Sequence, residues 1–334
     1  MMSAAETTTT KVPPPRRHSS PPGRGPGRRR AARGRRVHLS RAFTPWLLLA
    51  PCILVLVLVL GYPLIKLGIL SFQDYKKPQL WGFKPATWVG FDNYTAILKD
   101  SEFWDVVVRT IVFAGAAVVL TMVLGMLIAL LLQRVSGWVR TLVNIALVAS
   151  WAMPVVVAVT VFKWMFDSDY GVVNWVLTKL PGVDYTGHNW FASGPEGLSV
   201  IMLQVVWGAI PFVVITLGAG LTQVPKELEE AARLDGADAF GVFRYVTFPI
   251  IKPLVVMMTT LSVIWDMGVF AQVWLMRGGH PEPEFQLLTT YSYEKAFGVN
   301  DYASGSAIAL LTVLLLLGVV AVYMRQMLKI GEVE

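Results

Sequence analysis

The segment PKELEEAARLDGADAFGVFRYVTFPIIKP, residues 225–253, decides how the rest of this chain is arranged, because it is charged and helix-forming in an otherwise apolar sequence. Pro225 stands where the first turn of a helix tolerates proline, since that position needs no N–H donor. Glu227, Glu229 and Glu230 follow at the positive end of the helix dipole, where carboxylates are favoured. A helix is therefore expected to begin at the start of this segment.

The second half of the segment predicts a turn and another helix. Gly236 supplies the backbone freedom that commonly ends a helix, and Asp238 is a candidate N-cap for the helix that follows. Pro249 and Pro253 are expected to close the segment, because proline cannot continue the hydrogen bonding of a helix interior. The predicted arrangement is helix, sharp turn and helix.

The first of these helices has a shallow face. Leu228, Ala231 and Ala232 share one side at helical spacing, while Glu229 and Arg233 can form an ion pair one turn apart on another side. Two alanines allow another surface to approach the helix closely. An ordinary solvated helical hairpin is the alternative interpretation of this pattern.

Composition places the chain in a membrane. It has 334 residues, a mean hydropathy of +0.55, 54% hydrophobic residues and only 15% charged residues, which is too apolar for most soluble domains of this size. Its single cysteine, Cys52, lies in a long apolar run and cannot form a disulfide within the chain. We expect it to contribute packing or lipid contact.

The basic charge of the chain belongs to its N-terminal tail. Residues 1–41 hold eleven Lys or Arg and one acid, a charge of +10, so the remaining residues sum to −3 against a total of +7. Residues 1–43 are predicted to be a disordered Arg/Pro-rich cytoplasmic tail, because they cannot bury enough apolar surface to become ordered. We interpret this tail as setting topology or attracting lipid. A twin-arginine signal or a cleaved signal peptide fits less well, because the apolar run that follows is too long for either. A nucleic-acid-binding arm also fits less well, because no aromatic residues are interleaved with the arginines.

Six stretches are long and apolar enough to cross about 30 Å of hydrocarbon as helices of about 20 residues. They run roughly from Pro45 to Phe72, Val106 to Leu132, Val139 to Met165, Leu198 to Leu221, Ile250 to Met276 and Gly305 to Leu328. Membrane helices tolerate proline when neighbouring groups satisfy the freed carbonyls, and kinks are expected at such positions. The kink positions are Pro51, Gly61 and Pro63 in the first stretch, Pro154 in the third and Pro211 in the fourth.

Basic residues near the span ends predict the orientation of the chain. The tail, the loop between the second and third spans, the 225–253 segment and the C-terminal end carry Lys and Arg and are placed in the cytoplasm. The intervening segments, residues 72–105, 166–197 and 277–304, are placed outside, where an external partner could dock. An even number of spans puts both termini in the cytoplasm.

The chain shows no catalytic pattern. The phosphate-binding motif G-x-x-x-x-G-K-[ST] does not occur, so the chain cannot bind ATP in that way, and any energy it uses must come from another subunit or an ion gradient. The four histidines lack metal-ligand spacing, and nothing in the apolar spans supplies the base that a nucleophilic serine needs. We expect no catalytic residue and no metal site.

Asp266 is the residue within the spans that most requires an explanation. A carboxylate inside a membrane helix costs about 2.5–3.5 kcal/mol on insertion scales, so it is expected to face the bundle interior, a water-filled path or a partner. Alternatively, it lies near the outer interface and binds a backbone amide or a lysine. Trp265 and Gln272 add aromatic and hydrogen-bonding groups that suit a polyhydroxylated ligand. The weaker candidates for the same path are Trp151, Asn144, Gln204 and Trp207.

The segment that opened this section resembles the cytoplasmic Glu-Ala-Ala loop of membrane subunits in ATP-binding-cassette (ABC) importers. Further stretches resemble the sugar-type branch of these permeases: YPLIKLGILSFQDY at 62–75, VGFDNYTAIL at 89–98, MPVVVAVTVFKWMFDSDYGVVN at 153–174 and GGHPEPEFQLLTTYSYEKAF at 278–297. The resemblance covers residues 44–334, with a family core at about 105–325 and the loop at 222–250. Phe248 departs from the pattern, since leucine is usual there.

The resemblance implies an all-α integral membrane protein with the six-transmembrane-helix type I ABC importer fold, in a bacterial cell membrane. It implies a second homologous permease subunit, giving a heterodimer, together with two copies of a cytoplasmic ATPase subunit and an extracytoplasmic sugar-binding protein. On this view the chain binds no cofactor, and the ATPase uses ATP with Mg. The residues implied to dock in the ATPase are Glu230, Ala231, Ala232, Asp235 and Gly236.

The leading hypothesis is a permease subunit, without enzymatic activity, that forms the translocation path of a binding-protein-dependent importer of carbohydrate, expected to be oligosaccharide. Two alternatives remain at this point. One is an ABC permease for a non-sugar solute such as glycerol phosphate, and the other is an ion-driven secondary transporter. The second would call for paired intramembrane ionisable residues or broken helices in matching halves, whereas the spans offer essentially Asp266 and, near a span end, Lys163.

Overall fold

A computed structural model describes residues 39–331, and nearly all of its regular structure is helical. The chain divides into two compact units, residues 1–56 and 57–334. The described part of the first unit is α1, Leu39–Leu56. Residues 1–38 of the predicted tail lie outside the described residues, so the tail stays a prediction; residues 39–43 form the first part of α1.

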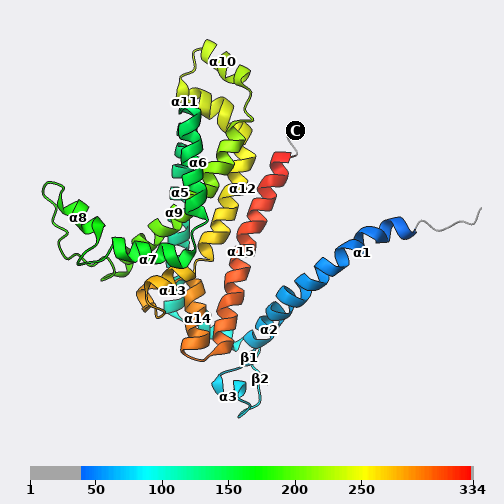
Figure 1. The fold of residues 1–334 in the computed structure, drawn as a ribbon. Helices are drawn as coiled ribbons and strands as arrows, with labels where there is room; N and C mark the ends of the chain where they lie inside the picture. The colour runs from blue at the N-terminus through cyan, green and yellow to red at the C-terminus, as the bar shows by residue number, and fades with distance from the viewer. Residues whose placement is uncertain (1–38, 332–334) are drawn as a thin grey trace, which may run out of the picture. The chain divides into compact units, whose positions relative to one another are not determined.

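Five helical stretches of the described residues are long and apolar enough to cross a membrane, and a bent helix pair brings the number to as many as six. The five are Leu48–Ser71, Ser101–Arg134, Gly194–Leu221, Ala239–Met267 and Tyr302–Arg325. The predicted all-α membrane fold is therefore confirmed. Figure 1 shows the long helices of the second unit running side by side.

The third predicted span is two helices rather than one kinked helix. α6, Gly137–Trp151, and α7, Val155–Met165, meet at 100°. Pro154 stands at the break, where it offers no N–H and disfavours helical geometry in the residue before it. The break was expected at this residue, but its size was not. Pro211, by contrast, lies within the continuous helix α9, Gly194–Leu221.

α9 is the centre of the second unit, where it packs against α5, Ser101–Arg134, and α12, Phe248–Met267. Glycines permit these close contacts: a Cβ atom on Gly125 of α5 would lie 2.6 Å from Val213 Cγ1, and one on Gly220 would overlap Leu254 of α12. Without a hydrophobic force between helices in lipid, such close contact is a main source of helix association. The three helices therefore form the packed base on which the remaining elements are placed.

The helix that follows the charged loop does not close at its prolines, which corrects the sequence-based expectation. α11, Ala239–Val242, the π-helical turn η2, Phe243–Thr247, and α12 are continuous, and they pass through Pro249 and Pro253. The N–H of Phe248 bonds the carbonyl of Phe243, five residues back, so the ladder is already widened immediately before Pro249. A π-turn of this kind leaves room for a residue that cannot donate. The predicted fifth span, Ile250–Met276, instead ends at Met267, and α13, Ala271–Met276, follows a break.

The segments predicted to lie outside contain short elements of their own. A two-stranded antiparallel ribbon pairs Gln73 of β1 with Trp88 of β2. The outer elements are β1 (Gln73–Asp74), α3 (Lys77–Leu80), β2 (Thr87–Trp88), α4 (Asp92–Lys99), α8 (Val172–Thr178), η3 (Pro283–Phe285), α14 (Leu288–Tyr293) and η4 (Glu294–Gly298). The remaining elements are η1 (Val57–Gly61), α2 (Tyr62–Ser71), α10 (Lys226–Leu234) and α15 (Tyr302–Gly331).

One ion pair braces the proline-rich part of the last outer segment. Arg277 Nε donates to Glu282 Oε2 at 2.8 Å, and the same guanidinium lies 4.1 Å from the ring centroid of Phe285. The Arg277 hydrogen bond holds the pKa of the Glu282 carboxyl below its ordinary value. Phe285 is fully buried, so this pair attaches the turn to the core.

Replacing Gly125 with leucine is expected to destabilise the protein by about 1–3 kcal/mol, because the new side chain must displace Val213 at the α5–α9 contact. Gly115→Leu is the matched control on the same helix, since nothing lies within 4 Å of its Cβ position. Thermal unfolding of both purified variants in detergent compares them. Equal unfolding temperatures would contradict the packing described for α9.

Candidate functional site

The charged loop forms a short helix that is fastened to the adjoining span. α10, Lys226–Leu234, carries Glu229, whose Oε1 accepts a hydrogen bond from Thr247 Oγ1 at 3.2 Å. The other carboxylate oxygen of Glu229 pairs with Arg233 Nη2 at 3.4 Å, one helical turn later. The predicted Glu229–Arg233 pair is therefore confirmed. Because Thr247 is buried at the start of α12, α10 is attached to the long span through a side chain as well as through the backbone.

The turn after α10 has the predicted geometry. Gly236 has φ of +91°, in the region that favours glycine, and nothing lies within 4 Å of its Cβ position. The N–H of Ala237 bonds the carbonyl of Ala232 at 2.9 Å, which closes the helix end. Asp238 Oδ1 then accepts from the N–H of Gly241 at 2.7 Å and caps α11, as predicted.

The loop presents an apolar surface to its surroundings. Leu234 is 90% exposed, Tyr245 78% and Phe240 71%. Among the residues implied to dock in an ATPase, Glu230, Ala231, Asp235 and Gly236 are exposed, and Ala232 is half-buried. Figure 1 shows α10 projecting beyond the ends of α5 and α9. Large exposed apolar side chains next to charged ones mark a surface that another protein can cover.

A group of aromatic rings connects three helices of the second unit. Trp151, at the end of α6, stacks against Phe212 of α9 with centroids 6.4 Å apart, and Phe212 contacts Trp265 of α12 at 5.3 Å. We call these three residues the inner aromatic group. Two of them were candidates from the sequence, and Phe212 was missed. Phe212 directly follows the buried Pro211, and nothing in the sequence around it indicates a role in the path.

Asp266 follows Trp265 on α12 but is buried, with 3% of its surface exposed against 47% for Trp265. Within the described residues, its Oδ2 atom and the Oε1 atom of Gln204 are buried without a hydrogen-bond partner. A buried acceptor without a donor costs about 1–3 kcal/mol, so such atoms are uncommon unless a ligand or water supplies the bond. Both oxygens are closed to solvent in this structure.

The other predicted path residues lie in different places. Trp207 contacts Phe162 of α7 at 5.8 Å. Asn144 lines a cavity of about 350 Å³ together with Arg140 and Thr222, near the cytoplasmic ends assigned from the sequence. Gln272 lies on α13, beyond the break that ends α12. The structure therefore brings Trp151 and Trp265 together, and it places Asn144 and Gln272 elsewhere.

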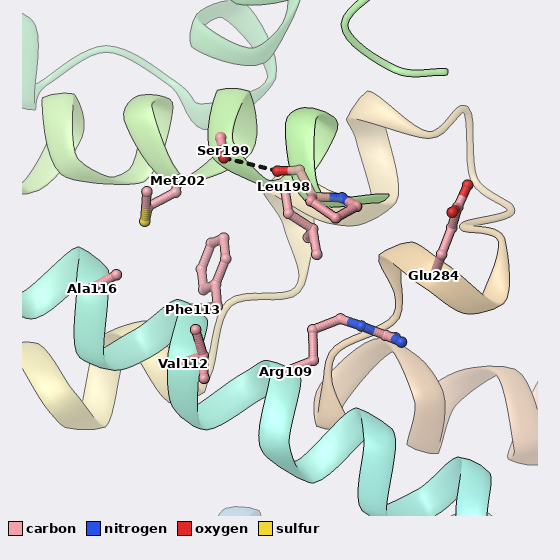
Figure 2. Close-up of a pocket in the computed structure, with 9 residues that line it drawn as sticks. Arg109, Val112, Phe113, Ala116, Leu198, Ser199, Met202 and Glu284 are labelled. Atoms are coloured by element: carbon pink, nitrogen blue, oxygen red, sulfur yellow. Dashed lines mark hydrogen bonds between the residues drawn. The ribbon is translucent and has the colours of Figure 1, made fainter. Parts of the chain in front are cut away.

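The cavity drawn in Figure 2 does not contain any of these predicted residues. It measures about 430 Å³ between α5 and α9, with Arg109 and Glu284 at one end and Ala116 and Met202 at the other. Arg109 Nη1 donates to the carbonyls of Pro283 at 2.6 Å and Gln286 at 3.0 Å. The guanidinium therefore holds the last outer segment in place, and the cavity lining is mostly apolar.

The inner aromatic group and Asp266 together suit recognition rather than catalysis. Aromatic faces can pack on the C–H faces of a sugar ring, while carboxyl and amide oxygens accept from its hydroxyls. A site for a polyhydroxylated molecule requires both hydrogen-bond acceptors and apolar ring faces.

Comparison with known proteins finds similar chains. Residues 121–329 match a family described as binding-protein-dependent transport system inner membrane component. The chain is 44% identical over 303 residues to the diacetylchitobiose uptake system permease protein of Streptomyces coelicolor, covering 90% of this chain and 92% of that protein. It is 32% identical over 238 residues to the trehalose/maltose transport system permease protein of Thermococcus litoralis, covering 71% and 79%.

A solved structure shares the fold. A chain of a bacterial ABC transporter involved in the import of the acidic polysaccharide alginate aligns with a TM-score of 0.73 and 19% identity, covering 87% of this chain and 96% of that one. At this identity the likeness concerns the fold alone.

Asp266→Leu is expected to raise the thermal unfolding temperature of the purified chain by a few degrees, because it removes a buried carboxylate without a partner. Thr260→Val is the control on the same helix, since its hydroxyl donates to the Val256 carbonyl of its own helix at 3.0 Å. That variant should unfold within about a degree of the wild type. A lower unfolding temperature for Asp266→Leu would show that the carboxylate contributes to folding.

Proposed function

This chain belongs to the family of binding-protein-dependent transport system inner membrane components, and on that premise we propose that it forms half of the path by which an acetylated amino-sugar disaccharide, such as diacetylchitobiose, enters the cell. The chain is a permease subunit of a carbohydrate ABC importer and a multi-pass protein of the cell membrane. It is not an enzyme, because ATP hydrolysis belongs to a separate ATPase subunit.

The 44% identity to a diacetylchitobiose permease, over nearly the whole of both chains, is the observation that carries the choice of substrate. The inner aromatic group and Asp266 supply what such a molecule needs: ring faces for the sugar rings and acceptors for hydroxyl and amide N–H groups. Glycerol phosphate and ion-driven transport are not favoured, since the relatives named above are sugar permeases of the same family.

Partner subunits complete the transporter in this proposal. Trp151 and Trp265 are exposed in the single chain, so a second permease subunit would close the path around them. We place this chain in a heterodimer with a homologous permease, two copies of a cytoplasmic ATPase and an extracytoplasmic sugar-binding protein. ATP with Mg would be bound by the ATPases, and both termini would lie in the cytoplasm.

The loop would couple conformational changes of the ATPase to the membrane helices. Its docking residues are Glu230, Ala231, Ala232, Asp235 and Gly236, which the exposed apolar side chains Leu234 and Phe240 adjoin. From the turn, one continuous helix runs from Ala239 to Met267 and carries Trp265 and Asp266 near its far end. A displacement of α10 would therefore move the substrate-path residues directly.

Deleting this chain from cells should abolish ATP-dependent uptake of labelled diacetylchitobiose, and restoring the wild type should return it. Restoration with Gly236→Val should recover less than about a tenth of the rate, because a β-branched residue is strained at φ of +91°. The measurement is the initial uptake rate across a panel of mono- and oligosaccharides.

Gly137→Val is the matched control, since this glycine also has open space at its Cβ position and lies outside the region of positive φ. It should restore at least half of the wild-type rate. If no saccharide in the panel depends on the chain, the proposed substrate is wrong. If Gly236→Val transports and retains its ATPase like Gly137→Val, the proposed role of the loop is wrong.

A further inference from the structure

A second set of aromatic rings lies at the outer ends of the helices. Phe270 and Trp274 stack with centroids 5.4 Å apart, and Tyr293 lies 4.7 Å from Trp274. Phe297 follows at 4.8 Å from Tyr293, and Tyr302 at 5.8 Å from Phe297. We call these five residues the outer aromatic row. They come from the segment before α13, α13, α14, η4 and α15, so the fold gathers them from distant parts of the sequence.

Four of the five, Phe270, Tyr293, Phe297 and Tyr302, line a cavity of about 460 Å³, and Trp274 packs against Phe270 and Tyr293 behind them. The cavity volume lies within the range of about 300–1,000 Å³ that is typical of small-molecule sites. Thr289, Ser292 and Ser306 add hydroxyl groups to the aromatic lining. Thr289 Oγ1 donates to the Val269 carbonyl and Ser292 Oγ to the Gly305 carbonyl, so both hydroxyl oxygens are held in place and can still accept a hydrogen bond.

Two rings of the row are exposed enough to meet a ligand. Phe297 is 58% exposed and Tyr293 38%, although Phe297 contacts two other rings and Tyr293 three. Rings whose only role was core packing would be covered on both faces. Aromatic residues that anchor a protein at the membrane interface are a separate possibility, but such anchors need neither contact with one another nor hydroxyl groups around a shared cavity.

We propose that the outer aromatic row and its cavity form a second saccharide site, which receives the disaccharide before it reaches the inner aromatic group. This inference rests on the proposed function. Phe270 follows Asp266 by four residues, across the break between α12 and α13, so the row begins where the inner path residues end. The ring faces bind the sugar rings, and the hydroxyls of Thr289, Ser292 and Ser306 accept from the sugar.

The test measures binding of diacetylchitobiose to the assembled transporter in lipid nanodiscs by saturation-transfer NMR. Trp265→Ala is present throughout, so that the inner aromatic group contributes little. Tyr293→Leu and Phe297→Ala are expected to weaken binding at least about fivefold, because each removes a ring face on which a sugar ring packs. Tyr293→Phe keeps the ring and should remain within about twofold. Trp88→Ala, an exposed aromatic of strand β2 outside the row, is the control and should also remain within about twofold.

Three outcomes would overturn the inference: equal binding in Tyr293→Leu and Trp88→Ala, a loss in Tyr293→Phe as large as in Tyr293→Leu, or no binding in the Trp265→Ala background. Equal binding in Tyr293→Leu and Trp88→Ala would mean that the rings only anchor the protein at the membrane interface. An equally large loss in Tyr293→Phe would mean that Tyr293 has a structural role. Uptake by the wild type in cells is measured in parallel. If uptake is normal and any of these results is found, only the proposal of an outer site is wrong. If uptake is absent, the proposed substrate is wrong.

Discussion

The close packing of α9 against α5 and α12 is the interaction on which the rest of the structure depends. Gly125 and Gly220 let the helices approach until side chains of the neighbouring helix fill the space of a missing Cβ atom. In lipid, where apolar side chains gain little by leaving the solvent, such contacts and internal hydrogen bonds decide which helices associate. Because the loop adjoins α9 and α12 at one end and Trp265 and Asp266 lie near the other, this packing holds both functional regions in one packed body of helices.

Within that body, one helix joins the loop to the path. The stretch from Ala239 to Met267 has 29 residues, a length of about 40 Å at 1.5 Å per residue. Asp238 caps its beginning, and Glu229 of α10 accepts a hydrogen bond from Thr247 in its third turn. A force on α10 therefore reaches the helix through the backbone of the turn and through this side-chain bond. The ABC importer permease thus carries its coupling surface and its substrate-path residues on the same element.

The sequence predicted best where a local rule decides the geometry. Gly236, Asp238 and the Glu229–Arg233 pair act within one or two turns of the chain, and all three were found as expected. Prediction from the sequence failed where contacts between distant residues decide the geometry. The 100° bend at Pro154, the helix through Pro249 and Pro253, and the contact of Phe212 with Trp265 depend on tertiary packing or on a π-turn. Phe270 and Trp274 stand near Asp266 in the sequence, but their contact with Tyr293, Phe297 and Tyr302 was not predicted, since the five residues span more than thirty positions of sequence.

Reactivity of a cysteine at position 265 tests most directly whether the loop moves the path. Trp265→Cys is made in a Cys52→Ser background, because Cys52 is the single native cysteine. A membrane-impermeant maleimide is then added on the outer side of the assembled transporter. The account predicts that ATP changes the labelling rate severalfold and that Gly236→Val abolishes this change without altering the rate in the absence of ATP. An ATP-dependent change of the same size in both loop backgrounds would contradict it.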